Sequence, residues 1–426
     1  MYYTEPQRQI PIKKTDVAVI GSGPSGIAAA LTAARLGRKV IIVEQLGTLG
    51  GISTSGMMSH WTGTCDSRLY REILEESSAR NENKEITVNI DTEKLKYLYL
   101  SMLSKAGAEI MLYTLASDVI MEGDALKGVI VENKSGRYAI LADTVIDASG
   151  DGDIAAMAGV PYILGREADS KMQPATLMFK VAGVDTDKAV YLDSFESIYQ
   201  TERGELQALA KKLLPAPAGH VLLYRSPLRG VVTCNMTNAV DINGTKNEDL
   251  VRAELTCRGQ IDTIIDFLRE YVPGYENCYL IGTASLMGIR ETRHFEGQYT
   301  LTEDDVLQAR VFEDWIVKGA HFNFDVHNLG GAGLDKTGVQ QNFTQEEGYT
   351  IPLGCFLPKE VKNLMLCGRN ISGTHMAHSN YRAMPICVGM GEGCGAVAAY
   401  AGKYQTALQN ANIAAVQRYL TDGTLF

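Results

Sequence analysis

Short, continuously apolar runs separated by glycine turns open the chain. VAVI at 17–20 precedes the turn GSGPSG, a stretch of small apolar residues follows, and VIIV at 40–43 ends at Glu44. Apolar runs of this length bounded by turn residues are typical of strands buried on both faces, and the stretch between them has the length of a crossover helix. Residues 16–44 therefore predict a strand–helix–strand unit with parallel strands.

The pattern after Glu44 changes several times. A Gly, Ser and Thr-rich loop without periodicity, at 45–66, leads to two helical patterns at 67–80 and 92–105, the second with Asp91 as its N-cap. Short apolar runs then predict four strands, the last two joined as a hairpin, at 108–113, 117–122, 126–133 and 137–142. A return strand, a further glycine turn and a helix are expected within DTVIDASGDGDIAAMAG, which begins at residue 143.

The middle of the chain has a different pattern. Residues 161–334 predict mixed strands and one long helix at 248–271, with an apolar stripe made of Leu250, Ala253, Leu255, Ile261, Ile264, Ile265 and Leu268. Beyond residue 334 a strand with a glycine turn returns, and the small residues after Pro385 predict a helix that packs tightly against a sheet. We therefore expect an α/β fold in which a Rossmann-type domain with a β-meander, residues 1–160 and 335–426, carries an inserted mixed α+β domain, residues 161–334.

Composition and charge restrict the function. A chain of 426 residues can bury a large core, and a formal charge of −10 without clustered Lys and Arg argues against a nucleic-acid surface. We find no signal-peptide pattern and no apolar run of ~18 residues, so we expect a cytoplasmic protein without a membrane span. Eight cysteines without CxxC and seven histidines without HExxH or a histidine–carboxylate cluster predict reduced thiols and no metal site.

The first glycine turn has the residues that binding of a diphosphate requires. Gly21 permits the tight turn after the strand, Gly23 lets the backbone approach phosphate oxygens, and Gly26 lets the helix pack close to the sheet. The free N–H groups and positive dipole end of the helix that begins near Pro24 then face the anion. Glu44, at the end of the second strand, is placed to accept hydrogen bonds from a ribose, so the stretch predicts a dinucleotide site.

Three glycine turns together, GSGPSG, IDASGDGD and NLMLCGRNISG, resemble those of FAD-dependent oxidoreductases in the glutathione-reductase-like flavoprotein superfamily. The segments LGTLGGISTSG, GIRETRHFEGQYTLTEDD and GRNISGTHMAHSNYRAMPICVGMGEGCG are similar to a bacterial branch of that family, and the resemblance spans nearly the whole chain. It implies a Rossmann-type FAD-binding domain, an inserted substrate or cap domain, and an enzyme that uses FAD.

The resemblance also implies roles for individual residues. Glu44 would bind the adenosine ribose, Val119 would offer its backbone to the adenine, and the helix after Pro385 would direct its N-terminus at the flavin, where its dipole favours the negative charge of the reduced ring. The implied cofactor-binding residues are Gly21, Gly23, Pro24, Ser25, Gly26, Glu44, Gln45, Gly50, Gly51, Val119, Ala148, Gly150, Gly368, Arg369 and Gly389.

Several residues depart from the family pattern or carry side chains that tether flavin in some relatives. Gln45 stands where many relatives have Arg or Lys, and Glu392 stands where Gln is expected, which would place a charge near the flavin. His60 and Cys65 follow the flavin-proximal loop, and His or Cys holds flavin covalently in some relatives. Because a single His near a flavin is more often a contact than a tether, we expect noncovalent FAD.

The segment GTHMAHSNYR, residues 373–382, offers groups for proton transfer. It contains His378 and Arg382, both of which we expect in the catalytic site, and a histidine pKa of about 6.5 suits a general base. The alternative interpretation is that His378 only holds the flavin or the loop.

The segment GIRETRH, residues 288–294, offers a site for an anion. If it is extended, Arg290, Thr292 and His294 share one face and line a pocket, where Arg290 would clamp a carboxylate or polarise a carbonyl. The alternative is a structural ion pair made by Glu291.

These features predict an FAD-dependent oxidoreductase, a dehydrogenase or oxidase, that transfers a hydride between a small polar metabolite and flavin N5. An anionic substrate fits the arginines. A redox-neutral elimination or isomerisation through transient substrate oxidation is the alternative, and a nonenzymatic FAD-binding module is a third. We find no second strand, GxGxxG, helix and acid series for a nicotinamide cofactor.

Overall fold

The apolar runs at 17–20 and 40–43 form adjacent parallel strands, as the sequence predicts. The computed structural model of the chain describes residues 7–77, 87–334 and 348–426. In it, β1 (Ile12–Ile20) pairs in parallel with β2 (Val40–Val43) on one side and with β8 (Gly136–Asp147) on the other. The side chains of all four residues at 17–20 are buried, because both faces of these central strands are covered.

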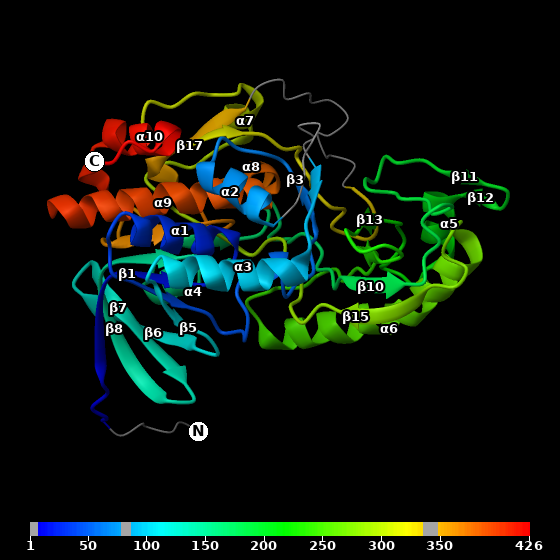
Figure 1. Cartoon of the computed structure of the whole chain (residues 1–426), viewed down its shortest axis with the longest axis horizontal. Helices are drawn as coiled ribbons and strands as arrows, with labels where there is room; N and C mark the ends of the chain where they lie inside the picture. Colours follow the sequence, from blue (N-terminus) through cyan, green and yellow to red (C-terminus); the bar gives the residue numbers. More distant parts are fainter. Residues whose placement is uncertain (1–6, 78–86, 335–347) are drawn as a thin grey trace.

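Within the described residues these strands belong to a seven-stranded sheet (Figure 1). Its order is β5-β2-β1-β8-β7-β6, and β19 pairs with β8 beside that path. The other strands of this sheet are β5 (Glu109–Met111), β6 (Leu115–Glu122), β7 (Ala125–Asn133) and β19 (Leu364–Leu366). The sheet is therefore mixed: β5, β2, β1, β8 and β19 are parallel, whereas β6 and β7 form the predicted meander.

One detail of the predicted meander is wrong. The apolar pattern predicts a hairpin strand at 137–142 and a separate return strand that begins at 143, whereas β8 is a single strand over both. It stays paired with β1 from Ala139 to Asp147, so the chain has no reason to turn. The first half of β8 pairs with β7 and its second half with β19, which brings the C-terminal part of the chain into the sheet.

Two helices rich in small residues lie side by side over the sheet. In Figure 1, α1 (Pro24–Arg35) lies between the sheet and α9 (Met384–Tyr404). A Cβ added at Gly391 would lie 2.0 Å from Ser25 O, and one added at Gly395 would lie 2.5 Å from Ala29 O. The glycines of α9 therefore allow close helix–helix contact. The prediction that this helix packs tightly against a sheet is confirmed at β17 (Trp315–Ala320), where a Cβ added at Gly393 would lie 2.4 Å from Ile316 O, whereas its contact with α1 is not predicted.

The remaining helices of this part cover the sheet and close its edges. Two predicted starts are confirmed, because Ser67 caps α2 and Asp91 caps α3 through their side chains. The predicted end of the first of these helices, at Arg80, lies outside the described residues. The other described helices and short strands of this part are η1 (Gly51–Ser53), β3 (His60–Thr62), α2 (Arg68–Glu76), β4 (Thr87–Asn89), α3 (Thr92–Lys105), α4 (Asp153–Met157), η4 (Leu408–Asn410) and α10 (Ile413–Asp422).

A second layer extends from this body on the right of Figure 1. It consists of an antiparallel sheet of order β13-β14-β10-β15 with the long helix α6 (Asn247–Tyr271) packed along it. The predicted helix at 248–271 is confirmed. Leu255 of its predicted apolar stripe is 72% exposed, because it borders a cavity instead of the core. The other elements here are β10 (Phe179–Ala182), β11 (Gln200–Thr201), β12 (Gly204–Glu205), α5 (Leu206–Leu213), β13 (Leu223–Arg225), β14 (Val232–Cys234) and β15 (Tyr279–Thr283).

The buried apolar side chains form two clusters that correspond to these two parts. One contains the seven-stranded sheet and its helices, and the other runs from Ala175 to Met287. Buried side chains from Phe295 to Phe324 belong to the first cluster, although the sequence analysis assigns them to the inserted domain. The connecting elements are β9 (Tyr162–Leu164), β16 (Arg293–Phe295), α7 (Glu303–Leu307), β17 (Trp315–Ala320), β18 (Tyr349–Pro352), η3 (Leu353–Cys355) and α8 (His375–Tyr381).

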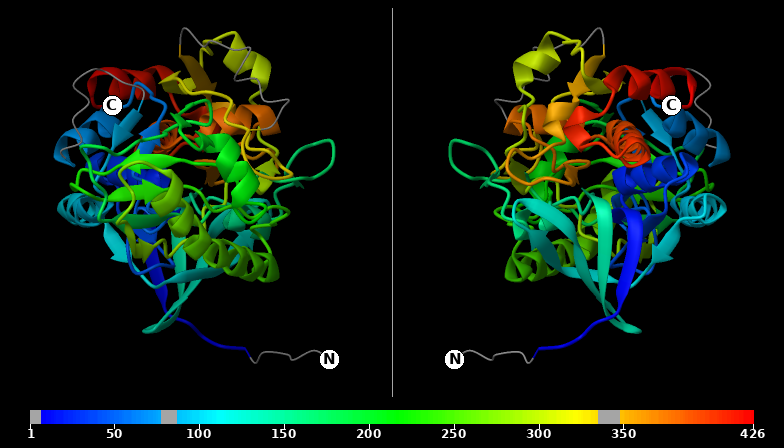
Figure 2. Two further views of the ribbon diagram at one scale, coloured as in Figure 1. Left: turned by 90° about the vertical axis from the view of Figure 1, so that its right-hand side faces the viewer. Right: turned by 90° about the vertical axis from the view of Figure 1, so that its left-hand side faces the viewer.

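The side views in Figure 2 show the sheet of the first part, its helical cover and the second layer from either end. Among the described helices, none is both long enough and apolar enough to cross a membrane.

Candidate functional site

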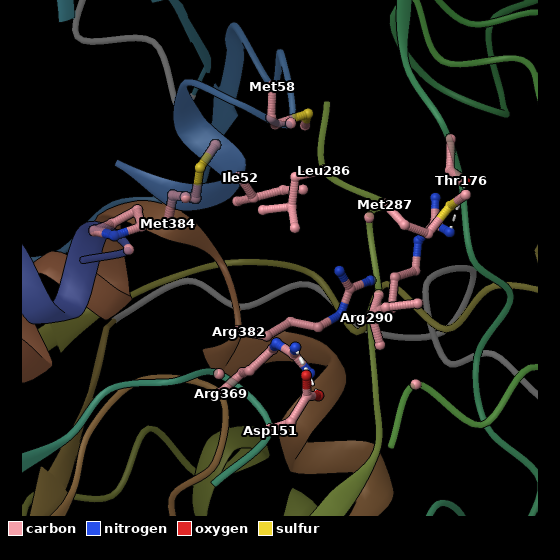
Figure 3. Close-up of a pocket in the computed structure, with 18 of the residues that line it drawn as sticks. Ile52, Met58, Asp151, Thr176, Leu286, Met287, Arg290, Arg369, Arg382 and Met384 are labelled. Atoms are coloured by element: carbon pink, nitrogen blue, oxygen red, sulfur yellow. Dashed lines mark hydrogen bonds and ion pairs between the residues drawn. The ribbon is translucent and has the colours of Figure 1, made fainter. Parts of the chain in front are cut away.

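A cavity of about 1050 Å³ lies where the carboxyl ends of β1 and β2 meet the second layer. Ile20 and Val43 border it from the sheet, and Met178, Tyr224 and Arg290 border it from the other side. Part of its wall is drawn in Figure 3. In open parallel sheets ligands bind outside the carboxyl ends of the strands, so this is the expected place for a cofactor.

The first glycine turn shapes one end of the cavity. Gly21 has φ +95°, and a Cβ there would lie 2.3 Å from Ala148 O. A Cβ at Gly26 would lie 2.0 Å from Gly21 O, so both positions require glycine. Gly23 is the N-cap of α1 and offers no side-chain cap, and Pro24 and Ser25 of the first helical turn line the cavity. The free N–H groups of the helix N-terminus are therefore available to an anion.

Glu44 ends β2 at the cavity wall, as predicted, and its carboxylate is held in place. It accepts hydrogen bonds from Ser22 N at 3.0 Å, from Ser22 Oγ at 2.5 Å and from Leu46 N at 2.8 Å. Two bonds fall on one oxygen and one on the other, so the second oxygen keeps a lone pair for a hydroxyl group of a ligand.

The second and third glycine turns converge on the start of α1. Asp147, at the end of β8, accepts hydrogen bonds from Ser149 Oγ at 2.7 Å and from Ala155 N at 2.8 Å, which fixes the turn between them; burial raises the pKa of Asp147 to about 6. Gly368 has φ +101°, and a Cβ there would lie 2.6 Å from Ser25 Oγ. These contacts form a narrow backbone cradle that fits an extended dinucleotide.

The predicted cofactor-binding residues divide into three groups. The residues that line the cavity are Gly21, Gly23, Pro24, Ser25, Glu44, Gln45, Gly51, Ala148, Gly150 and Arg369. Gly26, Gly50 and Gly368 do not line the cavity, but each is next in sequence to a residue that does. Val119 and Gly389 lie elsewhere: Leu115 and Ala116 at the start of β6 border the cavity instead of Val119, and Gly389 packs against Cys65 Sγ and Val317.

Three arginines border the cavity but differ in their partners, and Figure 3 shows Arg369 beside Asp151 and Arg290 beside Thr176. Arg369 pairs with Asp151 at 2.8 Å, and Arg382 pairs with Asp325 at 2.7 Å. Arg290 donates through Nη1 to Pro174 O and, at 2.8 Å, to Thr176 Oγ1. Among the described residues no carboxylate pairs with it.

The guanidinium of Arg290 is thus a partly buried cation at the cavity wall, and among the described residues no acid forms an ion pair with it. Burial, with a further contribution from the nearby Arg382, lowers the pKa of Arg290 to about 10, so the group still carries its charge at neutral pH. An isolated buried charge is costly, and a bound anion removes most of that cost.

The residue that follows Arg290 faces the opposite way. Glu291 is fully buried and accepts hydrogen bonds from His375 Nδ1 at 2.6 Å, from His294 Nε2 at 2.8 Å and from Gln173 N at 3.0 Å. Burial alone would raise the pKa of Glu291, but the two imidazoles hold it well below its ordinary value. Arg290 lines the cavity and Glu291 makes structural hydrogen bonds to two histidines, so the binding of an anion by Arg290 stays a prediction.

The expectation that Thr292 and His294 share the pocket face of Arg290 is wrong. The segment before β16 is not a regular strand, so side chains do not alternate there. Thr292 Oγ1 donates to Asp151 Oδ1 at 2.6 Å, and His294 turns inward, with Nδ1 3.0 Å from Gly373 O.

His378, the predicted base, does not line the cavity. It is 1% exposed, and its ring packs edge-on against His294 at 4.9 Å between ring centroids. Burial holds the pKa of His378 well below its ordinary value, and in the described part of the chain its Nδ1 has no hydrogen-bond partner.

Glu291, His294 and His378 form a histidine–carboxylate cluster that the sequence analysis did not find, because Glu291 and His378 are far apart in the chain. Their possible ligand atoms lie within 4.8 Å of one another. The 2.8 Å separation between Glu291 and His294 is that of a hydrogen bond, and Arg382 and Arg369 add positive charge near His378. Within the cluster, Glu291 and His294 are thus joined by a hydrogen bond and His378 packs on His294 through its ring, while the hydrogen bond from His375 to Glu291 ties α8 to the segment around Arg290.

The two candidate tethers differ. His60 borders the cavity, but its ring stacks on Tyr224 at 4.1 Å and its Nδ1 lies 3.1 Å from Asn89 Oδ1. Cys65 does not border the cavity: its Sγ donates to Pro385 O at 2.9 Å, and burial raises its pKa well above the ordinary value. Neither arrangement favours a covalent bond, and noncovalent binding stays a prediction.

The first turn of α9 borders the cavity through Met384 and Cys387, as expected for this helix start. Glu392, two turns along the helix, does not: it accepts a hydrogen bond from Ser67 Oγ at 2.6 Å at the N-terminus of α2. The expectation of a charge near the flavin is therefore wrong, because Glu392 lies on the face of α9 that meets α2.

Asp325 and His327 are cavity residues that the sequence analysis missed. They lie in a loop after β17, FNFDVHN, which carries no recognised motif, and only the fold brings them beside Arg382. A histidine two residues after an acid is a weak signal without that context.

Comparisons with known proteins agree with this geometry. A family model described as FAD dependent oxidoreductase matches residues 16–420. A digeranylgeranylglycerophospholipid reductase from Methanosarcina acetivorans is 28% identical over 198 residues, which are 40% of this chain and 46% of that protein. A thiamine thiazole synthase from Desulfosudis oleivorans is 28% identical over 203 residues, 43% of this chain and 71% of that protein. The chain thus matches about half the length of the first relative.

Solved structures show the same fold at low identity. A geranylgeranyl bacteriochlorophyll reductase-like protein from Thermoplasma acidophilum superimposes with a TM-score of 0.53 and 15% identity, over 97% of this chain and 85% of that one. A flavin-dependent brominase gives a TM-score of 0.50 and 12% identity over 96% and 84%. The family match shows that the cofactor is FAD and that the chain is an enzyme. It belongs to the family of FAD dependent oxidoreductases.

Proposed function

We propose that the enzyme transfers a hydride between FAD and a small metabolite that carries a carboxylate, and that Arg290 binds this carboxylate. The observation that carries the proposal is the partly buried Arg290 guanidinium, which borders the cavity and has no ion-pair partner among the described residues. Bound FAD supplies a two-electron acceptor or donor at flavin N5.

The neighbouring charges support binding of one carboxylate. Asp151 and Asp325 already neutralise Arg369 and Arg382. Of the three described arginines that border the cavity, Arg290 is left for the ligand, and its fork geometry suits a carboxylate. Because Pro174 O and Thr176 Oγ1 hold Nη1, the guanidinium is oriented before the ligand arrives. Arg382, predicted as catalytic, would act beside it by orienting Asp325.

A redox-neutral reaction, in which the substrate is transiently oxidised and then eliminates or isomerises, remains the second candidate. It uses the same cofactor and the same anion contact. Anaerobic product analysis separates the two candidates: net oxidation stops after one turnover without an acceptor, whereas the redox-neutral route continues.

The proposal is tested with a panel of 2-hydroxy and 2-amino carboxylates, each paired with its uncharged amide. The purified FAD-loaded enzyme is mixed with each compound without oxygen, and flavin bleaching is followed by absorbance. We expect at least one acid to bleach the flavin at concentrations where its amide does not. Bleaching by amides as readily as by acids, or by neither series, would contradict the proposal.

A further inference from the structure

An acid–imidazole pair lies in the cavity wall next to the anion site. His327 Nε2 lies 3.3 Å from Asp325 Oδ2, and both residues border the cavity. The same Asp325 oxygen accepts a hydrogen bond from Arg382 Nη2 at 2.7 Å, and Gln173 Oε1 accepts one from His327 N at 3.2 Å. The loop that carries the pair is thus fixed from two sides.

The contacts of His327 determine which of its nitrogens is free. Asp325 stays ionised, because His327 and Arg382 hold its pKa well below the ordinary value despite its burial. An ionised carboxylate can only accept hydrogen bonds, so Nε2, which faces Asp325, carries the hydrogen of the neutral imidazole of His327 and the lone pair is on Nδ1. In the described part of the chain no hydrogen bond is made to Nδ1. Phe195 packs edge-on against the ring at 5.1 Å and restricts its rotation.

We propose that His327 Nδ1 accepts the proton that the substrate loses, and that Asp325 is the positioning residue that keeps Nδ1 unprotonated. This inference rests on the proposed function. The substrate C–H hydrogen leaves with its electron pair as a hydride to FAD, the adjacent O–H or N–H proton moves to Nδ1, and a C=O or C=N bond forms. The resulting imidazolium is paired with Asp325 and returns its proton to solvent.

The charges around His327 couple this base to substrate binding. The titratable groups that face it are Asp325, Arg382, Arg290 and His220. Burial, together with the positive charge of Arg290, lowers the pKa of His327 to about 4. A carboxylate bound to Arg290 cancels that positive charge, so the pKa of His327 rises when an anion binds. The base therefore becomes stronger when the substrate is present.

The test uses the FAD-loaded enzyme labelled with ¹⁵N in its histidine rings, with acetate as the probe and His327→Gln to assign the signals. Nuclear magnetic resonance should show His327 as the Nε2–H tautomer at pH 7, with a pKa that rises when acetate is added. In Arg290→Gln that pKa should be higher at the start and insensitive to acetate. Asp325→Asn should allow the Nδ1–H tautomer to appear.

Two outcomes overturn the inference and leave the proposed function intact. One is an Nδ1–H tautomer of His327 at pH 7 in the unmodified enzyme. The other is acetate binding that requires Arg290 but does not move the pKa of His327. Acetate binding that is the same in Arg290→Gln would instead overturn the proposed function, and the tautomer would still decide the role of His327.

A kinetic comparison separates the two candidate bases. With any acid of the panel that bleaches the flavin, His327→Gln should slow bleaching at saturating acid by roughly a hundredfold or more, within the range of general-base catalysis. His378→Gln should slow it by less than about threefold, because His378 does not border the cavity. The reverse order would overturn the assignment and restore His378 as the base.

Discussion

At the scale of single residues, the charge of Glu291 organises the wall behind the cavity. Its carboxylate receives two imidazole hydrogen bonds and one backbone hydrogen bond in a site without solvent. Replacement by an amide removes the charge and leaves His294 or His375 facing a group of the wrong polarity. Arg290, the next residue, depends on this anchor for its direction into the cavity.

We predict that Glu291→Gln lowers the free energy of unfolding by about 3 kcal/mol at pH 7, the loss typical of a broken buried ion pair. The folded-state pKa of Glu291 is depressed. Its stabilisation is therefore complete above the unfolded pKa of about 4.3 and is lost as pH falls below it. Urea unfolding at pH 7, 5.5 and 4 should show a gap between the two proteins that narrows only at the lowest pH. Glu296→Gln, an exposed glutamate, is the control. A gap that widens toward pH 4 would contradict this prediction.

The local chemistry of the first glycine turn was predictable because it depends on neighbours in the sequence. Gly21, Gly23 and Glu44 take the positions that their spacing indicates. The positions of His378 and Asp325 could not be predicted from the sequence. They depend on how α8 and a loop after β17 meet the segment around Arg290. The sequence alone does not show whether the side chain of a histidine faces a cavity or a carboxylate.

At the scale of elements, the contact between α1 and α9 positions the cofactor cradle. The small residues of α9 let the two helix backbones approach, and α1 presents its N-terminus to the cavity. The sequence predicted the helix and its small face correctly. It predicted the contact with a sheet, which α9 makes with β17, but not the contact with α1, since a small face is equally suited to a sheet and to another helix.

We predict that Gly391→Ala destabilises the enzyme by about 1–3 kcal/mol, because its new Cβ would meet Ser25 O. Gly402→Ala, in the same helix, has only the flexible Arg38 side chain near it and should be neutral or stabilise by up to about 1 kcal/mol. Thermal unfolding of both variants measures the difference. The two substitutions should also differ in FAD content, because only the first displaces α1. Equal stabilities would show that the helix contact is looser than the structure indicates.

At the scale of the whole molecule, two differently built parts share one cavity. The first part supplies a parallel sheet with its glycine turns, and the second supplies an antiparallel sheet with a long helix. Among the described residues, the second sheet has no parallel strand–helix–strand unit for another dinucleotide. The order of elements let the sequence predict this division, but not that residues 295–324 would pack with the first core.

We therefore predict that NADH and NADPH do not bleach the flavin efficiently, whereas the released cofactor is unmodified FAD. Anaerobic mixing with either nucleotide should leave the flavin absorbance unchanged over many seconds. Acid precipitation should leave the yellow colour in the supernatant. Rapid bleaching would reveal a nicotinamide site, and colour in the pellet would indicate a covalent link, with His60 as the first residue to examine.

The measurement that tests the account most directly is the concentration dependence of anaerobic flavin bleaching in Arg290→Gln. With an acid from the panel, removal of this charged contact, worth roughly 1.5–3 kcal/mol, should raise the half-saturating concentration by about one to two decades. Arg229→Gln, an exposed arginine of the second layer, should match the unmodified enzyme. FAD content should be the same in all three proteins. A half-saturating concentration that is unchanged in Arg290→Gln would contradict the claim that this arginine binds the substrate carboxylate.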